Sequence, residues 1–172
     1  MPAGAVDEAG RLRGRFDATV NIPWLALQDE NGTVRASMTI GTSGPSVTLA
    51  DENGAVRASM RLATSGPSVT LIDEHRSLRV SLSVFQGTPG LSLWDEMGNS
   101  RASLDVFQGT PGLVLRDERS NPRVSLNVLQ GNPGLILWDE RTNRRASLSV
   151  LNEAGALFLF DAAGRLTFSA PH

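Results

Sequence analysis

The sequence has no cysteine, no lysine and no tyrosine, and each absence removes a class of chemistry. Without cysteine there are no disulfides, thiolate zinc sites or cysteine nucleophiles. Without lysine and tyrosine there are no lysine-amine or dityrosine crosslinks, so we expect any association between copies to rest on non-covalent contacts. Apolar runs such as LILW at 135–138 are far too short to span a bilayer as a helix, and the N-terminus lacks the apolar core of a secretory signal.

The chain also has little net charge, because its acidic and basic residues nearly balance. The net charge is −2 with a pI near 5.7, which gives no general attraction to nucleic acid or anionic lipid. A hydrophobic content of 40% in 172 residues is typical of a globular chain that forms one domain. We therefore expect a single domain over residues 1–172, with no nucleic-acid partner and no membrane span.

What the sequence does contain is a repeat. An Asp recurs every 22 residues without insertion, at Asp7, Asp29, Asp51, Asp73, Asp95, Asp117, Asp139 and Asp161. Internal periods of 20 to 50 residues are typical of solenoids, propellers and arrays. The repeat therefore predicts the fold before any local motif does.

Each repeat has the pattern of a β-hairpin. Leu91 and Leu93 alternate with variable residues before Asp95, and Ala102, Leu104 and Val106 alternate with polar residues after it. A four-residue loop pairs Leu93 with Ala102 and Leu91 with Leu104, which places all the apolar side chains on one face. The D-E-x-G segment suits a tight turn, with positive φ expected at Gly32, Gly54, Gly98 and Gly164.

One hairpin is too small to be stable alone, so its neighbours must hold it. The sequence predicts an all-β fold of eight tandem 22-residue β-hairpin repeats, stacked into an elongated hairpin stack or β-solenoid. Like charges in the Arg column favour antiparallel hairpins, because a parallel coil brings each Arg within about 4.8 Å of its twin. A fold-back of the sheet, a second copy or the opposite strand of an arched solenoid could cover the apolar face.

Fifteen of the eighteen carboxylates lie in two turn columns, and an Arg column follows six residues after the Asp column. Clustered carboxylates can bind calcium or act in catalysis, but an Arg beside each Asp favours structural ladders. His75 and His172 are the only histidines, and neither belongs to a distinct catalytic set. We therefore expect no enzyme, metal or cofactor. The predicted ladders are Asp29, Asp51, Asp73, Asp95, Asp117 and Asp139 with Arg35, Arg57, Arg79, Arg101, Arg123 and Arg145.

A column of large side chains precedes the Asp column and comprises Trp94, Arg116 and Trp138. In the hairpin model Trp94 faces Arg101 and Trp138 faces Arg145, which predicts cation–π contacts on the outer face. The same side chains could form a platform for a glycan or a partner protein, although we expect no small-molecule ligand.

The two ends of the chain differ in side-chain size. The last repeat is rich in aromatic residues, whereas the first carries small residues at corresponding positions. We expect the two ends of neighbouring copies to meet head to tail, a contact that does not close and so gives a filament. Alternatively, the aromatic residues fold inward as a cap. The predicted assembly interface comprises Ala3, Gly4, Ala5, Gly14, Phe158, Phe160, Leu166 and Phe168.

The G-x-P-x-L-x-L-x-D-E-x-G-x-x-R-A-S-L unit, clearest over residues 87–151, resembles bacterial tandem repeats of this pattern. It is also similar to β-hairpin-stack proteins that assemble into extracellular fibres. The 22-residue period resembles that of curli, but the Ser, Gln and Asn ladder of curli is reduced here to Gln86, Gln108 and Gln130. The resemblance implies a structural, extracellular subunit of a cross-β-like homopolymer that extends head to tail and can pair laterally. The alternative is a discrete β-repeat scaffold that binds a protein or glycan on its variable outer face.

Overall fold

A computed structural model describes residues 3–18, 22–151 and 153–170 of the chain. Among these residues the regular elements are sixteen β-strands. They fall into two compact units, Met1–Gly87 and Thr88–His172, which contain strands β1–β8 and β9–β16 respectively. The predicted all-β class is confirmed.

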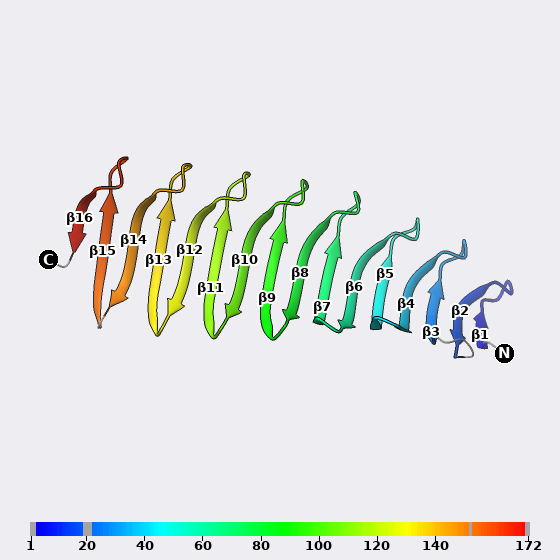
Figure 1. The fold of residues 1–172 in the computed structure, drawn as a ribbon. Coiled ribbons are helices and arrows are strands. Elements are labelled where there is room, and N and C mark those ends of the chain that lie inside the picture. The colour runs from blue at the N-terminus through cyan, green and yellow to red at the C-terminus, as the bar shows by residue number, and fades with distance from the viewer. Residues whose placement is uncertain (1–2, 19–21, 152, 171–172) are drawn as a thin grey trace. The chain divides into compact units, whose positions relative to one another are not determined.

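The first unit is an antiparallel meander in which each strand pairs with its sequence neighbours (Figure 1). No pairing joins β1 to β8 among its described strands, so the sheet is open rather than closed or coiled as a solenoid. Its strands are β1 (Ala3–Val6), β2 (Leu12–Asp17), β3 (Trp24–Gln28), β4 (Val34–Gly41), β5 (Gly44–Ala50), β6 (Val56–Ala63), β7 (Gly66–Ile72) and β8 (Leu78–Phe85).

The second unit is a meander of the same kind, also antiparallel and open within its described strands (Figure 1). Its strands are β9 (Thr88–Trp94), β10 (Ser100–Phe107), β11 (Thr110–Arg116), β12 (Pro122–Leu129), β13 (Asn132–Trp138), β14 (Arg144–Leu151), β15 (Ala154–Phe160) and β16 (Leu166–Ala170). The predicted tandem hairpins with antiparallel pairing are therefore confirmed in each unit.

The hairpin turn follows from the D-E-x-G segment. The backbone N–H of Asp95 donates to the Asn99 carbonyl at 3.0 Å, and the N–H of Gly98 donates back to the Asp95 carbonyl at 3.2 Å. Gly98 has φ 79°, as expected for the left-handed residue that ends a three-residue loop. At the equivalent position in other repeats, Arg76 and Ser120 adopt the same positive φ without being glycine.

The predicted pairs Leu93 with Ala102 and Leu91 with Leu104 are confirmed, but the connection between the two strands is not a simple four-residue loop. The loop has three residues, and a β-bulge adds the fourth. Trp94 pairs with Ser100 and Leu93 with Ala102, so Arg101 is the extra residue. The same register shift occurs in all eight hairpins, where the extra residue is Arg13, Arg35, Arg57, Arg79, Arg101, Arg123, Arg145 or Thr167.

The strands place the apolar and variable side chains on opposite faces. We call the side that carries the residues four and two before each Asp, and seven, nine and eleven after it, the apolar face. The opposite side is the variable face. Among the described residues the only fully buried apolar side chain is that of Ala26, on the variable face. Neither unit therefore encloses a conventional hydrophobic core within this chain.

Candidate assembly surfaces

The turn Asp is held by the backbone of its own loop. In the fifth repeat, Oδ1 of Asp95 accepts hydrogen bonds from the N–H groups of Met97 at 3.0 Å and Asn99 at 2.8 Å. The same two bonds recur in the other repeats, for example from His75 and Ser77 to Asp73. One carboxylate oxygen is thus committed to the turn, which leaves Oδ2 for a side-chain partner.

That partner is the bulge Arg in the first seven repeats. A bulge changes the direction of its extra side chain, and here each guanidinium reaches Oδ2 of the Asp six residues earlier. The N···O separations are 3.8 Å (Arg13–Asp7), 3.3 Å (Arg35–Asp29), 2.9 Å (Arg57–Asp51), 3.4 Å (Arg79–Asp73), 4.0 Å (Arg101–Asp95) and 3.8 Å (Arg123–Asp117), and Arg145 contacts Asp139 in the same way.

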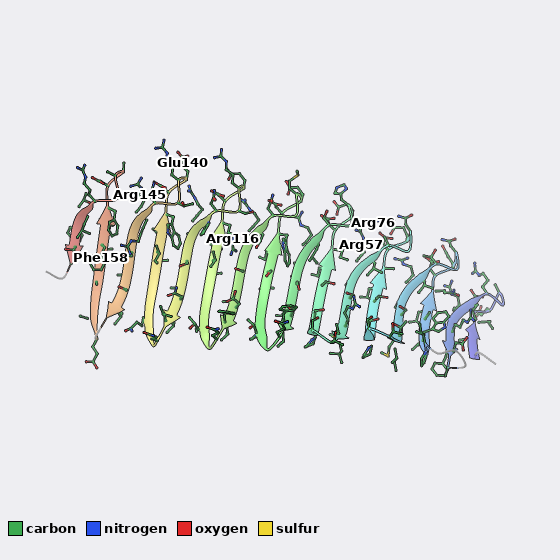
Figure 2. All side chains as sticks on the ribbon, in the orientation of Figure 1. Arg57, Arg76, Arg116, Glu140, Arg145 and Phe158 are labelled. Atoms are coloured by element: carbon green, nitrogen blue, oxygen red, sulfur yellow. The ribbon has the colours of Figure 1, made fainter. Side chains whose placement is uncertain are left out.

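Some of these Arg residues also tie one hairpin to the next. Arg35 donates from Nε to the carbonyl of Ala50 at 3.0 Å, in the following hairpin. Arg145, which lies beside the Asp turns in Figure 2, donates to the carbonyls of Asp161 and Ala162. The guanidinium therefore bridges two repeats, because it pairs with the Asp carboxylate of its own repeat and donates a hydrogen bond to a backbone carbonyl of the next.

The last repeat departs from this ladder. Thr167 occupies the bulge position, and its hydroxyl donates to the Leu159 carbonyl at 3.1 Å within its own hairpin. Arg165, four residues after Asp161, is the ion-pair partner of Asp161 at 2.8 Å, as Arg11 is of Asp7 at 2.9 Å. Because neither contact reaches beyond the hairpin, the eighth repeat offers no guanidinium tie to a ninth.

Hydrogen bonding keeps the turn carboxylates ionised. The N–H of Ser77 lowers the pKa of Asp73 most, and partial burial opposes it. Partial burial raises the pKa of Asp139, but the N–H and side-chain amide of Asn143, the N–H of Arg141 and the Arg145 guanidinium outweigh it and lower that pKa to about 2. Each ionised Asp of the Asp–Arg ladder thus holds its own turn by hydrogen bonds and pairs with a guanidinium.

Apart from the bulge Arg column and Thr167 at the Asp-turn end, the described strands present only Leu, Val, Ile, Ala, Met, Phe, Pro and Gly to the apolar face. Its most exposed row lies nine residues after each Asp. In that row Met38, Met60, Leu82, Leu104 and Leu148 each expose between 50% and 56% of their surface. Half-exposed large apolar side chains that recur along one row of each unit are typical of an interaction surface.

The variable face holds the predicted column of Trp94, Arg116 and Trp138. Arg116 donates from Nη1 to Oγ of Ser103 at 3.1 Å across the sheet (Figure 2). The predicted pairing of each Trp with the Arg of its own ladder is wrong, because the bulge moves that Arg out of register. Trp94 instead lies opposite Ser100, and Trp138 lies opposite Arg144.

Two cation–π contacts lie elsewhere on this face. The guanidinium carbon of Arg144 is 4.4 Å from the ring centre of Phe160, and that of Arg15 is 5.1 Å from the ring centre of Trp24. Sequence reasoning missed both, although a register that includes the bulge puts Arg144 directly opposite the Trp column. Phe160 is therefore engaged by a side chain of its own unit.

The predicted interface residues form two sets, one in each unit. In the first unit Ala5 pairs with Gly14, and β2 is the only neighbour of β1 among the described strands. In the second unit Phe168 pairs with Leu159, and β15 is the only strand beside β16 in the part of the chain that the structure describes. The remaining members are Ala3 and Gly4 in β1, Phe158 and Phe160 in β15, and Leu166 in β16.

An open groove of about 490 Å³ lies over the end of the second unit. Phe158, labelled on β15 in Figure 2, lines it together with Phe160 and Arg144. Its other walls are Gly134, Leu135, Ile136, Ser147, Leu148, Ser149 and Leu166. The lining is apolar apart from the guanidinium and two serines, so the groove suits packing better than chemistry.

In the part of the chain that the structure describes, no three His, Asp or Glu side chains come together as a metal site would require. No described helix has the length and apolar character needed to cross a membrane. No known family model matches the chain, and no curated protein matches it in sequence.

Proposed function

We propose that this protein is a structural, self-assembling subunit of an extracellular fibre, in which β16 of one copy pairs with β1 of the next. The support is that both strands are sheet edges, each with a neighbour on one side only among the described strands. Edge strands present unpaired N–H and C=O groups and are ready templates for another chain. Continued pairing would give a homopolymer with the strand spacing of cross-β structure.

The main observation behind this proposal is that the two edge strands carry side chains of complementary size at the position where they would pair. In the interior of the second unit, Ala146 of β14 pairs with Leu159 of β15. The same register between copies places Phe168, in the Ala146 position, opposite Ala5, in the Leu159 position. The large residue has changed strand, but the pair keeps one large and one small member, as cross-strand packing requires.

The junction is weaker than the interior pairs. Strands β1 and β16 have four and five residues, whereas β13 and β14 have seven and eight. Thr167 also replaces the Arg that would tie the eighth repeat to its successor. We therefore expect assembly to depend on concentration, with soluble subunits below a threshold and filaments above it.

The test is negative-stain electron microscopy across a concentration series, with fibre diffraction of any filaments. We expect a meridional spacing near the ~4.8 Å strand separation. Phe168→Ala leaves a gap at the junction and Ala5→Leu overfills it, so each should raise the assembly threshold. The double variant recreates the interior Ala–Leu pair and should restore assembly.

The matched control is Phe85→Ala, which removes an exposed Phe far from both edge strands in sequence and should assemble like the wild type. Dispersed wild-type particles at every concentration would refute the fibre. That result would favour a discrete scaffold that binds a protein or glycan through Trp94, Arg116 and Trp138. Failure of the double variant to recover, with each single variant impaired, would refute the register.

A further inference from the structure

We propose that the apolar face is covered by the apolar face of a second copy, so that two sheets pack face to face as a sandwich. This pairing uses the flat of the sheet and not its edges, and it does not rest on the proposed fibre. It concerns the rows of Leu, Val, Met and Ile that alternate with the variable-face residues along β3–β8 in the first unit and along β9–β15 in the second.

The first argument is area. The chain exposes 11568 Å², whereas a compact monomer of 18.4 kDa exposes about 8,200 Å². The surplus of about 3,400 Å² per copy far exceeds the roughly 800 Å² that each partner contributes to an interface of standard size. It reaches the range of obligate homodimers, whose interfaces resemble a domain core cut in half.

The second argument is chemical match. Because the strand positions that form this face carry no charged or hydrogen-bonding side chain apart from the bulge Arg column at the Asp-turn end, a partner surface must also be apolar over most of its area. The face is ribbed, with large Met or Leu residues in its middle row and alternating Leu with Ala or Val beside them, as in Leu93 opposite Ala102. A second copy offers the same ribs at the same strand spacing, so the side chains can interdigitate at a sheet separation of about 10 Å.

The third argument is that the charges remain in water. The ionised groups lie at the hairpin turns, in the bulge Arg column beside them or on the variable face, as Asp105 and Arg116 do. A face-to-face pair that meets over the middle of the strands therefore leaves the carboxylates and guanidinium groups at its margin or on its outer side. A lipid surface fits less well, since an open sheet leaves edge N–H and C=O groups without partners in hydrocarbon.

The methionines provide a test that needs no substitution. Met38 and Met60 lie in the middle row of the apolar face, 53% and 56% exposed, whereas Met97 lies on a turn and is 80% exposed. Oxidation by dilute hydrogen peroxide, read by peptide mass spectrometry, should be about tenfold slower at Met38 and Met60 than at Met97. Sedimentation velocity of the same samples should show a dimer or a multiple of one.

Two neighbouring substitutions on β8 supply the matched pair. Leu82 points to the apolar face and Ser83 to the variable face, where the equivalent position of β10 naturally carries Asp105. Leu82→Asp should raise the dimer dissociation constant by about 100-fold or more, because two unpaired carboxylates per dimer would be buried. It should also bring Met38 and Met60 to the reactivity of Met97. Ser83→Asp should leave both readouts unchanged.

Several results would overturn the proposal. A wild-type monomer at every concentration would do so, whether its methionines are reactive or are protected by a fold-back within the chain. So would an oligomer in which Met38 and Met60 react as fast as Met97, or protection that requires added phosphatidylcholine vesicles. If Leu82→Asp loses its β-sheet circular dichroism, the wild-type oxidation pattern still decides. Phe168→Ala removes one side chain of the apolar face, in β16 outside the β3–β15 rows, so it should impair head-to-tail growth far more than face-to-face pairing, and the failure of one proposal does not imply that of the other.

Discussion

The two units build the same hairpin with different side chains on the variable face. In the first unit the Ser residues that lie eight residues after Asp29 and Asp51 form hydroxyl pairs across the sheet, between Ser37 and Thr48 at 2.7 Å and between Ser59 and Thr70 at 2.8 Å. In the second unit the corresponding partners are apolar. Ser103 lies opposite Val114, Ser125 opposite Ile136 and Ser147 opposite Phe158.

The turns that join one hairpin to the next also differ between the two units. Gly44 and Gly66 begin strands in the first unit, and a Cβ added to either would lie 1.8 Å from a backbone carbonyl of the next strand. In the second unit Thr110 occupies the equivalent position, and the turn instead uses Gln108 and Gly109, both with positive φ. The two units thus keep the same strand register, although they use different turns and different side-chain pairs on the variable face. The shared elements, the Asp–Arg ladder and the apolar face, are what define the fold.

The largest expected effect tests what the units share. All eight turn aspartates have a pKa lowered from 3.8, and that of Asp139 falls to about 2. A folded-state pKa below the unfolded value stabilises the fold above about pH 4, and this contribution is lost as the pH falls toward about 2. We expect the melting temperature to drop across that window. A melting temperature that stays constant there would show that the ladder does not stabilise the fold.

The next effect tests the difference between the turns. Gly66→Ala should destabilise the protein by about 3 kcal/mol, because it combines a positive φ of 123° with a clash against the Val84 carbonyl. The matched change Thr110→Ala in the second unit should alter the free energy of unfolding by less than about 0.5 kcal/mol. Urea denaturation measures both. Equal effects at the two sites would mean that the turns are not distinct solutions.

The smallest effect tests the variable face. Thr70→Val removes the hydroxyl partner of Ser59 and should lower the free energy of unfolding by about 1 kcal/mol. The reverse exchange, Val114→Thr, should be nearly neutral, because Ser103 already accepts a hydrogen bond from Arg116. Urea denaturation of both variants distinguishes a required hydroxyl pair from an interchangeable one. A larger loss at Val114 than at Thr70 would contradict this interpretation.

Sequence periodicity predicted most of the fold but less of the candidate surfaces. The Asp spacing predicted the eight hairpins, and the alternation around Asp95 predicted the pairs Leu93–Ala102 and Leu91–Leu104. The alternation could not reveal the bulge at Arg101, because a bulge breaks the two-residue period on which the argument rests. That one displaced residue moved the predicted partner of Trp94 from Arg101 to Ser100.

By itself, therefore, the sequence determined the repeat, the strand alternation and the charge columns, because these depend on local spacing and side-chain type. Only the tertiary structure decided where each Arg reaches, since that depends on the bulge and on the next hairpin, as Arg35 and Ala50 show. It also decided that the apolar face stays uncovered within each unit. Alternation predicts that a sheet has an apolar face, but what lies against that face depends on how sheets meet in space.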